Sequence, residues 1–121
     1  MLRMNTRSFP LILSVLLLAA CGSGDDVSGS PPAAPSRLTA EPLAGGAHLT
    51  WTDNADNETE YMVMRMVDGV DTEYRVVATL PFDAGQYHDA PLTSRITYMY
   101  MVMAMNDDGQ TASNEVTFAA P

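Results

Sequence analysis

Between Ser36 and Ala119 the chain alternates short runs of strand-forming residues with clusters of turn-forming residues. Runs rich in Val, Thr, Tyr and Met recur at a spacing of roughly 8–12 residues, and Gly, Pro, Asn and Asp separate them. No stretch keeps the period of an amphipathic helix. We therefore predict an all-β fold, a sandwich of two antiparallel sheets with seven strands. The predicted strands are Ser36–Glu41, Ala47–Trp51, Glu60–Val67, Tyr74–Leu80, Gln86–Asp89, Thr97–Asn106 and Thr111–Ala119.

Three stretches carry a more specific pattern. The run Leu49–Asn54 contains the only tryptophan, Trp51, and Asn57 and Glu58 precede a run with Tyr61, Val63 and Arg65. The last third carries Tyr87, Asp89, Leu92, Thr97, Tyr98, Tyr100, Val102, Ala104, Asn106 and Gly109. Together these residues resemble a bacterial fibronectin type III domain, over about Pro35–Ala119. The sequence departs from the family pattern at four positions. These are Glu60, Pro91, Ser94 and Arg95, where the family usually has Gly, Gly, Pro and Gly.

The resemblance implies a seven-stranded immunoglobulin-like sandwich and four structural residues. Trp51 would lie in the core, and Tyr61 would also point inward. Tyr98 would form a tyrosine corner, its hydroxyl bonding the backbone near Leu92. Domains of this family are generally non-catalytic spacers or binders, so the resemblance implies no enzyme.

The first residues have the composition of a secretory signal that ends at the only cysteine. A basic segment with Arg3 and Arg7 precedes the apolar run Phe9–Ala20, which is shorter than the ~20 residues that span a bilayer. Leu18–Cys21 resembles the lipobox of bacterial lipoproteins. We predict a signal peptide over residues 1–20, an acylated Cys21 followed by a flexible linker over 21–35, and the domain over 36–120. An ordinary secretory signal or an anchor helix is the alternative.

The predicted signal also indicates a location. Gly22 follows the cysteine, and a residue other than aspartate there resembles the Gram-negative pattern that favours the outer membrane. We therefore expect a lipid anchor to the cell envelope, in the outer membrane, facing the periplasm or the cell surface. Acylation of Cys21 would leave no thiol for a disulfide, so stability would come from packing.

The mature part of the chain is strongly acidic. All fifteen acids follow Cys21, against four arginines and no lysine, a net charge of −11. This balance argues against nucleic acid and anionic lipid as partners. The chain has no Gly-rich phosphate loop, no nucleophile-elbow serine and two histidines that stand apart in sequence, His48 and His88. We therefore expect neither catalysis nor a bound cofactor other than the lipid.

Two predicted strands are apolar at nearly every position, which a one-sided sheet does not require. If Tyr61, Val63 and Tyr98 point inward, alternation turns the methionines of both strands outward. In the arrangement that the resemblance implies, the two strands are antiparallel neighbours. We predict a methionine face on the outside of this sheet, which binds a protein partner or a second copy. The methionine face comprises Met62, Met64, Met66, Met99, Met101, Met103 and Met105.

Two alternatives for this surface remain open at this point. Thioethers suit Cu(I), so the methionine face could instead make a periplasmic Cu(I)-binding lipoprotein. The other alternative is a tolerated apolar surface with no ligand, or one that the domain's own tether partly covers. A calcium site in the acidic loop with Asp53, Asp56, Glu58 and Glu60 is disfavoured, because its spacing does not match an EF-hand and turns commonly use Asp and Asn.

Overall fold

The computed structural model describes residues 29–121, and Pro31–Pro121 form one compact unit. The predictions for the signal peptide, for Cys21 and for the linker up to residue 28 lie outside the described residues. The described residues form eight strands and no helix. The strands are β1 (Ser36–Leu43), β2 (Gly46–Thr52), β3 (Glu60–Val67), β4 (Arg75–Pro81), β5 (Gln86–Asp89), β6 (Thr97–Asn106), β7 (Gly109–Ala112) and β8 (Val116–Ala119).

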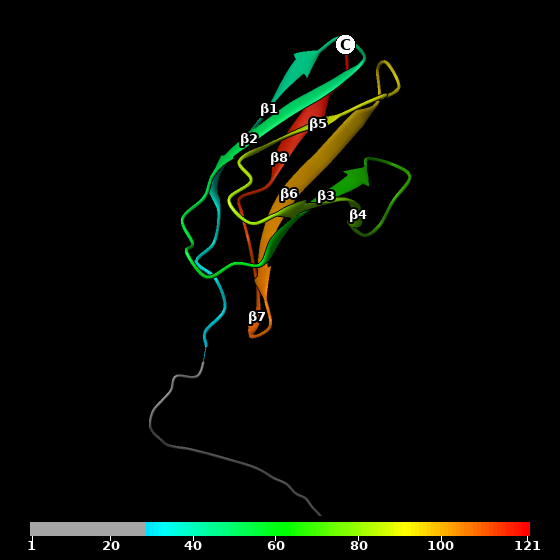
Figure 1. Ribbon diagram of the computed structural model, residues 1–121. Helices are drawn as coiled ribbons and strands as arrows, with labels where there is room; N and C mark the ends of the chain where they lie inside the picture. The colour runs from blue at the N-terminus through cyan, green and yellow to red at the C-terminus, as the bar shows by residue number, and fades with distance from the viewer. Residues whose placement is uncertain (1–28) are drawn as a thin grey trace, which may run out of the picture. The chain divides into compact units, whose positions relative to one another are not determined.

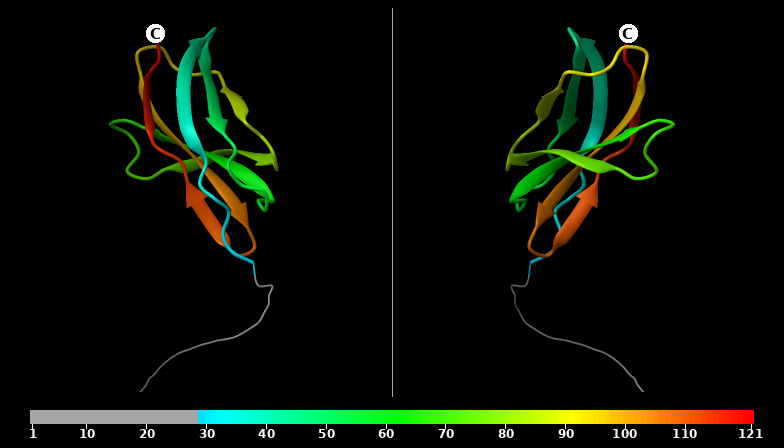
Figure 2. Two further views of the ribbon diagram at one scale, coloured as in Figure 1. Left: turned by 90° about the vertical axis from the view of Figure 1, so that its left-hand side faces the viewer. Right: turned by 90° about the vertical axis from the view of Figure 1, so that its right-hand side faces the viewer.

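The strands form two sheets that face each other (Figure 1; Figure 2). One sheet has the order β1-β2-β5; the other has the order β4-β3-β6-β7, and β8 also pairs with β6. Every pairing is antiparallel. This confirms the predicted all-β sandwich of two antiparallel sheets. The bounds of β3, β5 and β6 are those predicted, because these runs have the clearest alternation between turn clusters.

The core forms where the inward residues of both sheets meet. Burial alternates strictly along β6 from Thr97 to Met105, and along β3 from Glu60 to Met64. This is the two-residue period of a strand with one face on a core. The inward side chains of the two long strands pack against those of β1, β2 and β8. The buried apolar residues are Leu38, Ala47, Leu49, Trp51, Tyr61, Val63, Tyr98, Tyr100, Val102, Ala104, Phe118 and Ala120.

The last predicted strand, Thr111–Ala119, is two strands, which is why the structure has eight rather than seven. Between β7 and β8 the side chain of Asn114 reaches the other sheet. Its Oδ1 accepts a hydrogen bond from the Leu38 N–H at 2.9 Å, and its Nδ2 donates to the Leu38 carbonyl at 3.1 Å. The side-chain amide of Asn114 thus takes the place of a neighbouring strand for Leu38 of β1. The pairing with β6 is interrupted at this point, between β7 and β8.

Two further details concern the end of the linker and the turn before β6. The compact unit begins at Pro31, so the end of the predicted linker packs on the domain. Pro32 is buried, and its carbonyl accepts a hydrogen bond from the Thr111 hydroxyl at 2.8 Å. Arg95, at a position where the resemblance leads one to expect glycine, has a φ of 68°, a conformation that glycine adopts at lower cost.

Candidate functional site: the methionine face and the network beneath it

The seven methionines lie on the outer side of the sheet, over β3 and β6. The β3–β6 register places Met62 opposite Met103, Met64 opposite Met101 and Met66 opposite Met99. All seven are partly exposed, whereas their neighbours along each strand include the most buried residues of the core. Directly opposite residues have Cβ atoms about 4.5–5.5 Å apart. The surface is therefore a band of three facing methionine pairs, with Met105 beside it opposite Glu60.

The neighbouring strands extend this band without adding positive charge. On the β4 side, Met64 pairs with Val76, which is 48% exposed, and Met62 pairs with Thr79. On the other side the register places Thr117 beside Met99, and Ala112 beside Met103. The methionine face is thus continued by small, apolar or neutral side chains. A sheet surface of this kind is adaptable, because methionine side chains are unbranched and flexible.

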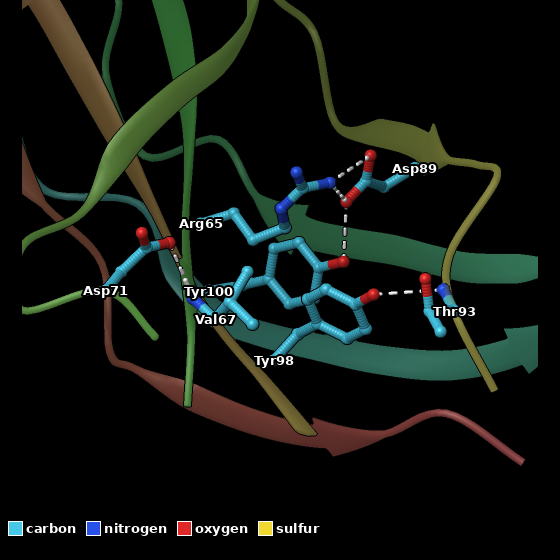
Figure 3. A network of polar contacts seen from close by, with 7 residues as sticks. All are labelled: Arg65, Val67, Asp71, Asp89, Thr93, Tyr98 and Tyr100. Carbon is cyan, nitrogen blue, oxygen red and sulfur yellow. Dashed lines mark hydrogen bonds and ion pairs between the residues drawn. The ribbon is translucent and has the colours of Figure 1, made fainter. Parts of the chain in front are cut away.

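Beneath this face, an ion pair joins the two sheets (Figure 3). Arg65 of β3 points inward, and its Nη1 donates to both carboxylate oxygens of Asp89 in β5, at 2.9 and 3.2 Å. The Tyr100 hydroxyl of β6 donates to Asp89 Oδ2 at 2.6 Å. The Asp89 side chain is only 7% exposed and that of Arg65 28%. A buried carboxylate with a cation and a hydroxyl donor is fully paired, so this network positions strands rather than binding a ligand.

Proton affinities in the network follow from burial and from this carboxylate. Burial, and then the hydrogen bond to Asp89, raise the pKa of Tyr100 above that of an ordinary tyrosine. Burial lowers the pKa of Arg65, but the hydrogen bond and charge of Asp89 outweigh it and raise the pKa overall. Both groups therefore keep their protons, and neither can serve as a base. Sequence reasoning placed Arg65 and Asp89 on separate strands and did not predict their contact.

The four residues expected to be structural lie as follows. Trp51 is 7% exposed and its ring packs against Tyr61, with the ring centroids 5.9 Å apart. Tyr98 is 5% exposed, and its hydroxyl accepts a hydrogen bond from the backbone N–H of Thr93 at 2.9 Å (Figure 3). Leu92 is partly buried against the core. The Tyr98 hydroxyl thus meets the backbone one residue beyond Leu92, which is the geometry of a tyrosine corner.

Two of the four residues of the acidic loop, Asp53 and Glu58, gather with an acid from another part of the chain. The carboxylates of Asp53, Glu58 and Asp83 lie within 4.8 Å of one another, and Asp83 comes from the distant β4–β5 turn. Two of these groups already have donors: the Tyr61 hydroxyl bonds Asp53, and the Asp83 N–H bonds Glu58 at 3.0 Å. Burial, and then this hydrogen bond to Asp53, raise the pKa of Tyr61. The cluster has the contacts of a turn that the chain's own donors hold in place.

The structure also brings together the two histidines, whose contact the sequence did not predict. His48 of β2 lies directly opposite His88 of β5 on the outer side of the other sheet. No sequence motif links the two positions, since they depend on the pairing of strands that are not consecutive. None of the residues from 29 to 121 belongs to a helix with the length and apolar character needed to cross a membrane.

Comparison with known proteins gives a fold. No family model matches the chain, and no curated protein matches it significantly. A solved structure of an Fn3-like protein from Clostridium thermocellum is 29% identical, with a TM-score of 0.61 over 76% of this chain and 96% of that chain. An FN3 domain of human collagen XX is 17% identical, with a TM-score of 0.61 over 77% and 100%. The chain has the fibronectin type III fold.

The fibronectin type III fold accounts for the strand order and for the tyrosine corner. A third similar structure, described as a myokine, is 23% identical, with a TM-score of 0.62 over 74% of this chain and 98% of that chain. The fold is typical of structural and interaction modules, but a fold alone does not specify a ligand. The feature that distinguishes this domain is its surface, in particular the methionine face.

Proposed function

We propose that this protein is a membrane-tethered, non-catalytic interaction module whose fibronectin type III domain binds a protein partner through the methionine face. The observation that carries the proposal is the outward row of facing methionine pairs on β3 and β6. A sheet face open to water is ordinarily polar, whereas a strand with apolar residues on both sides is usually covered on both. Large exposed apolar patches mark interaction sites on soluble domains.

The charge of the chain indicates the chemistry of the partner. With a net charge of −11 after Cys21, two copies of this domain repel each other at a distance. An apolar partner surface with a basic rim is attracted instead, and both features then contribute to binding. We therefore favour a different protein over a second copy, and self-association is one outcome that the following experiment distinguishes.

We expect replacement of Met62, Met64, Met101 and Met103 with threonine to abolish partner binding and leave the domain folded. Threonine keeps strand propensity and removes most of the apolar area. Because all four side chains are partly exposed, no core cavity forms. The measurements are a denaturant melt, the mass in solution, and capture of envelope proteins cross-linked in intact cells. If the wild type has a mass in solution above that of a monomer and the variant has the mass of a monomer, the methionine face mediates self-association.

A matched control removes apolar area elsewhere. Val70 and Phe82 are 76% and 62% exposed and lie in the turns on either side of β4. Their replacement with threonine should leave partner binding unchanged. Equal loss of binding in both variants would show that general hydrophobicity, and not the methionine face, retains the partner. Wild-type behaviour of the methionine variant in folding and in association would refute the proposal.

Cu(I) binding is the second candidate, because the register places three methionine pairs directly opposite one another. Thioethers are soft ligands that suit Cu(I), and paired flexible side chains can converge on one ion. Anaerobic titration against a competing Cu(I) chelator separates the two functions. A copper site predicts that the four-threonine variant loses Cu(I) affinity while its association without metal is unchanged.

The tether is tested at Cys21. We expect Cys21→Ser to shift the protein from the membrane fraction to the soluble fraction, since the sulfur that would carry the lipid is absent. Labelling with a palmitate analogue should tag the wild type and not the variant. A serine variant that is still labelled would contradict the assignment. The outer-membrane location is tested by separating inner and outer membranes of cells that express the wild type.

A further inference from the structure

The two histidines of the described chain form a pair across two strands. The β2–β5 register places His48 directly opposite His88. Their rings are in edge-to-face contact, with centroids 4.5 Å apart and an interplanar angle of 64°. Both lie on the outer side of the β1-β2-β5 sheet, where His48 is partly exposed and His88 is exposed. The pair is therefore built by strand pairing, and solvent reaches it from the His88 side.

The surroundings leave a ligand atom of the pair without a protein partner. His48 Nδ1 is buried and has no hydrogen-bond partner among the described residues. On the next strand, Glu41 lies opposite His48, which places a carboxylate on the same side of the sheet. The neighbouring pair on this face, Thr50 and Gln86, is uncharged. An unpaired imidazole nitrogen in ring contact with a second imidazole suits a transition-metal ion, and Glu41 adds a negative charge to the same side of the sheet.

We propose that His48 and His88 chelate a divalent transition-metal ion of the class that prefers imidazole, such as Cu²⁺, Ni²⁺ or Zn²⁺. Imidazole nitrogens bind such ions at about 2.0–2.1 Å, and directly opposite strand residues have Cβ atoms about 4.5–5.5 Å apart. The two rings can therefore meet at one ion by side-chain rotation, without movement of the strands. Water completes the coordination, and Cu²⁺ binds most tightly of the three.

This site is separate from the methionine face in position and in chemistry. The histidines lie on the three-stranded sheet, and the methionines lie on the sheet that contains β3 and β6. Imidazole suits borderline divalent ions, whereas thioethers suit Cu(I). The acidity of the chain raises the local concentration of any cation. Failure of one site therefore does not imply failure of the other.

The test uses the full chain, purified in detergent, with the metal ions alone as probes. We expect calorimetric titration to give the affinity order Cu²⁺, Ni²⁺, Zn²⁺. His48→Gln and His88→Gln should each weaken Cu²⁺ binding by at least about 10-fold, because the second ligand no longer closes the chelate. In the wild type, the electron paramagnetic resonance spectrum of the Cu²⁺ complex should show coupling to two nitrogens. Zn²⁺ should shift the ring resonances of both histidines.

Two controls make the result specific. The four-threonine methionine variant should keep Cu²⁺ affinity, since its substitutions lie on the other sheet. Gln86→Ala, next to the pair on β5, should also keep it. Wild-type Cu²⁺ affinity in both histidine variants would overturn the proposal. So would a wild-type Zn²⁺ titration that leaves the histidine ring resonances unshifted, a measurement that requires no variant to fold.

Discussion

Trp51→Ala is expected to lower the free energy of unfolding by about 3–5 kcal/mol, the range for deleting a buried aromatic side chain. Trp51 is 7% exposed, lies in β2 and packs against Tyr61 of the opposite sheet. Its removal leaves a cavity between the two sheets that the strands cannot close. Domains of this size have only about 5–15 kcal/mol in total, so the variant should be close to unfolding at physiological temperature.

The measurement is a denaturant melt followed by far-ultraviolet circular dichroism, which does not depend on tryptophan fluorescence. Tyr98→Phe is the matched control: it removes one hydroxyl and its hydrogen bond from Thr93 but keeps the ring. It should cost on the order of 1–2 kcal/mol. A Trp51→Ala midpoint equal to that of the wild type would mean that Trp51 does not fill the core.

Asp89→Ala is expected to cost about 2–4 kcal/mol of stability. Loss of one partner of a buried ion pair typically costs 3–5 kcal/mol. The value here should be lower, because the Arg65 side chain is 28% exposed and can turn toward water. The same substitution removes the acceptor of the buried Tyr100 hydroxyl. The effect therefore combines an unpaired cation with an unsatisfied donor.

A double-mutant cycle separates these two contributions. Adding Arg65→Met to Asp89→Ala removes the unpaired charge and fills similar volume with an apolar side chain, which often restores stability. We expect the double variant to be more stable than Asp89→Ala alone. Asp89→Asn, which keeps an acceptor for Tyr100, should lie between the wild type and Asp89→Ala. Equal stabilities of Asp89→Ala and the wild type would show that the pair contributes nothing measurable.

The methionine face shows how much of the structure the alternation of residues along a strand can predict. Alternation along a strand decides which side chains share a side, because successive residues point to opposite faces. The sequence alone therefore separated Tyr61 and Val63 from Met62 and Met64, and burial along β3 and β6 follows that division. The same alternation predicted the all-β fold and the bounds of three strands. It could not predict that the final strand breaks where Asn114 bonds Leu38.

Contacts between distant strands were decided only by the tertiary structure. The Arg65–Asp89 pair depends on how the two sheets face each other, and the His48–His88 pair depends on the register of β2 with β5. A shift of one residue in that register would turn one histidine away from the other. Periodicity is a property of each strand, so the sequence by itself determined the strands and their faces. Register and sheet packing arise from the summed burial of the whole core, and they alone decided which polar residues meet.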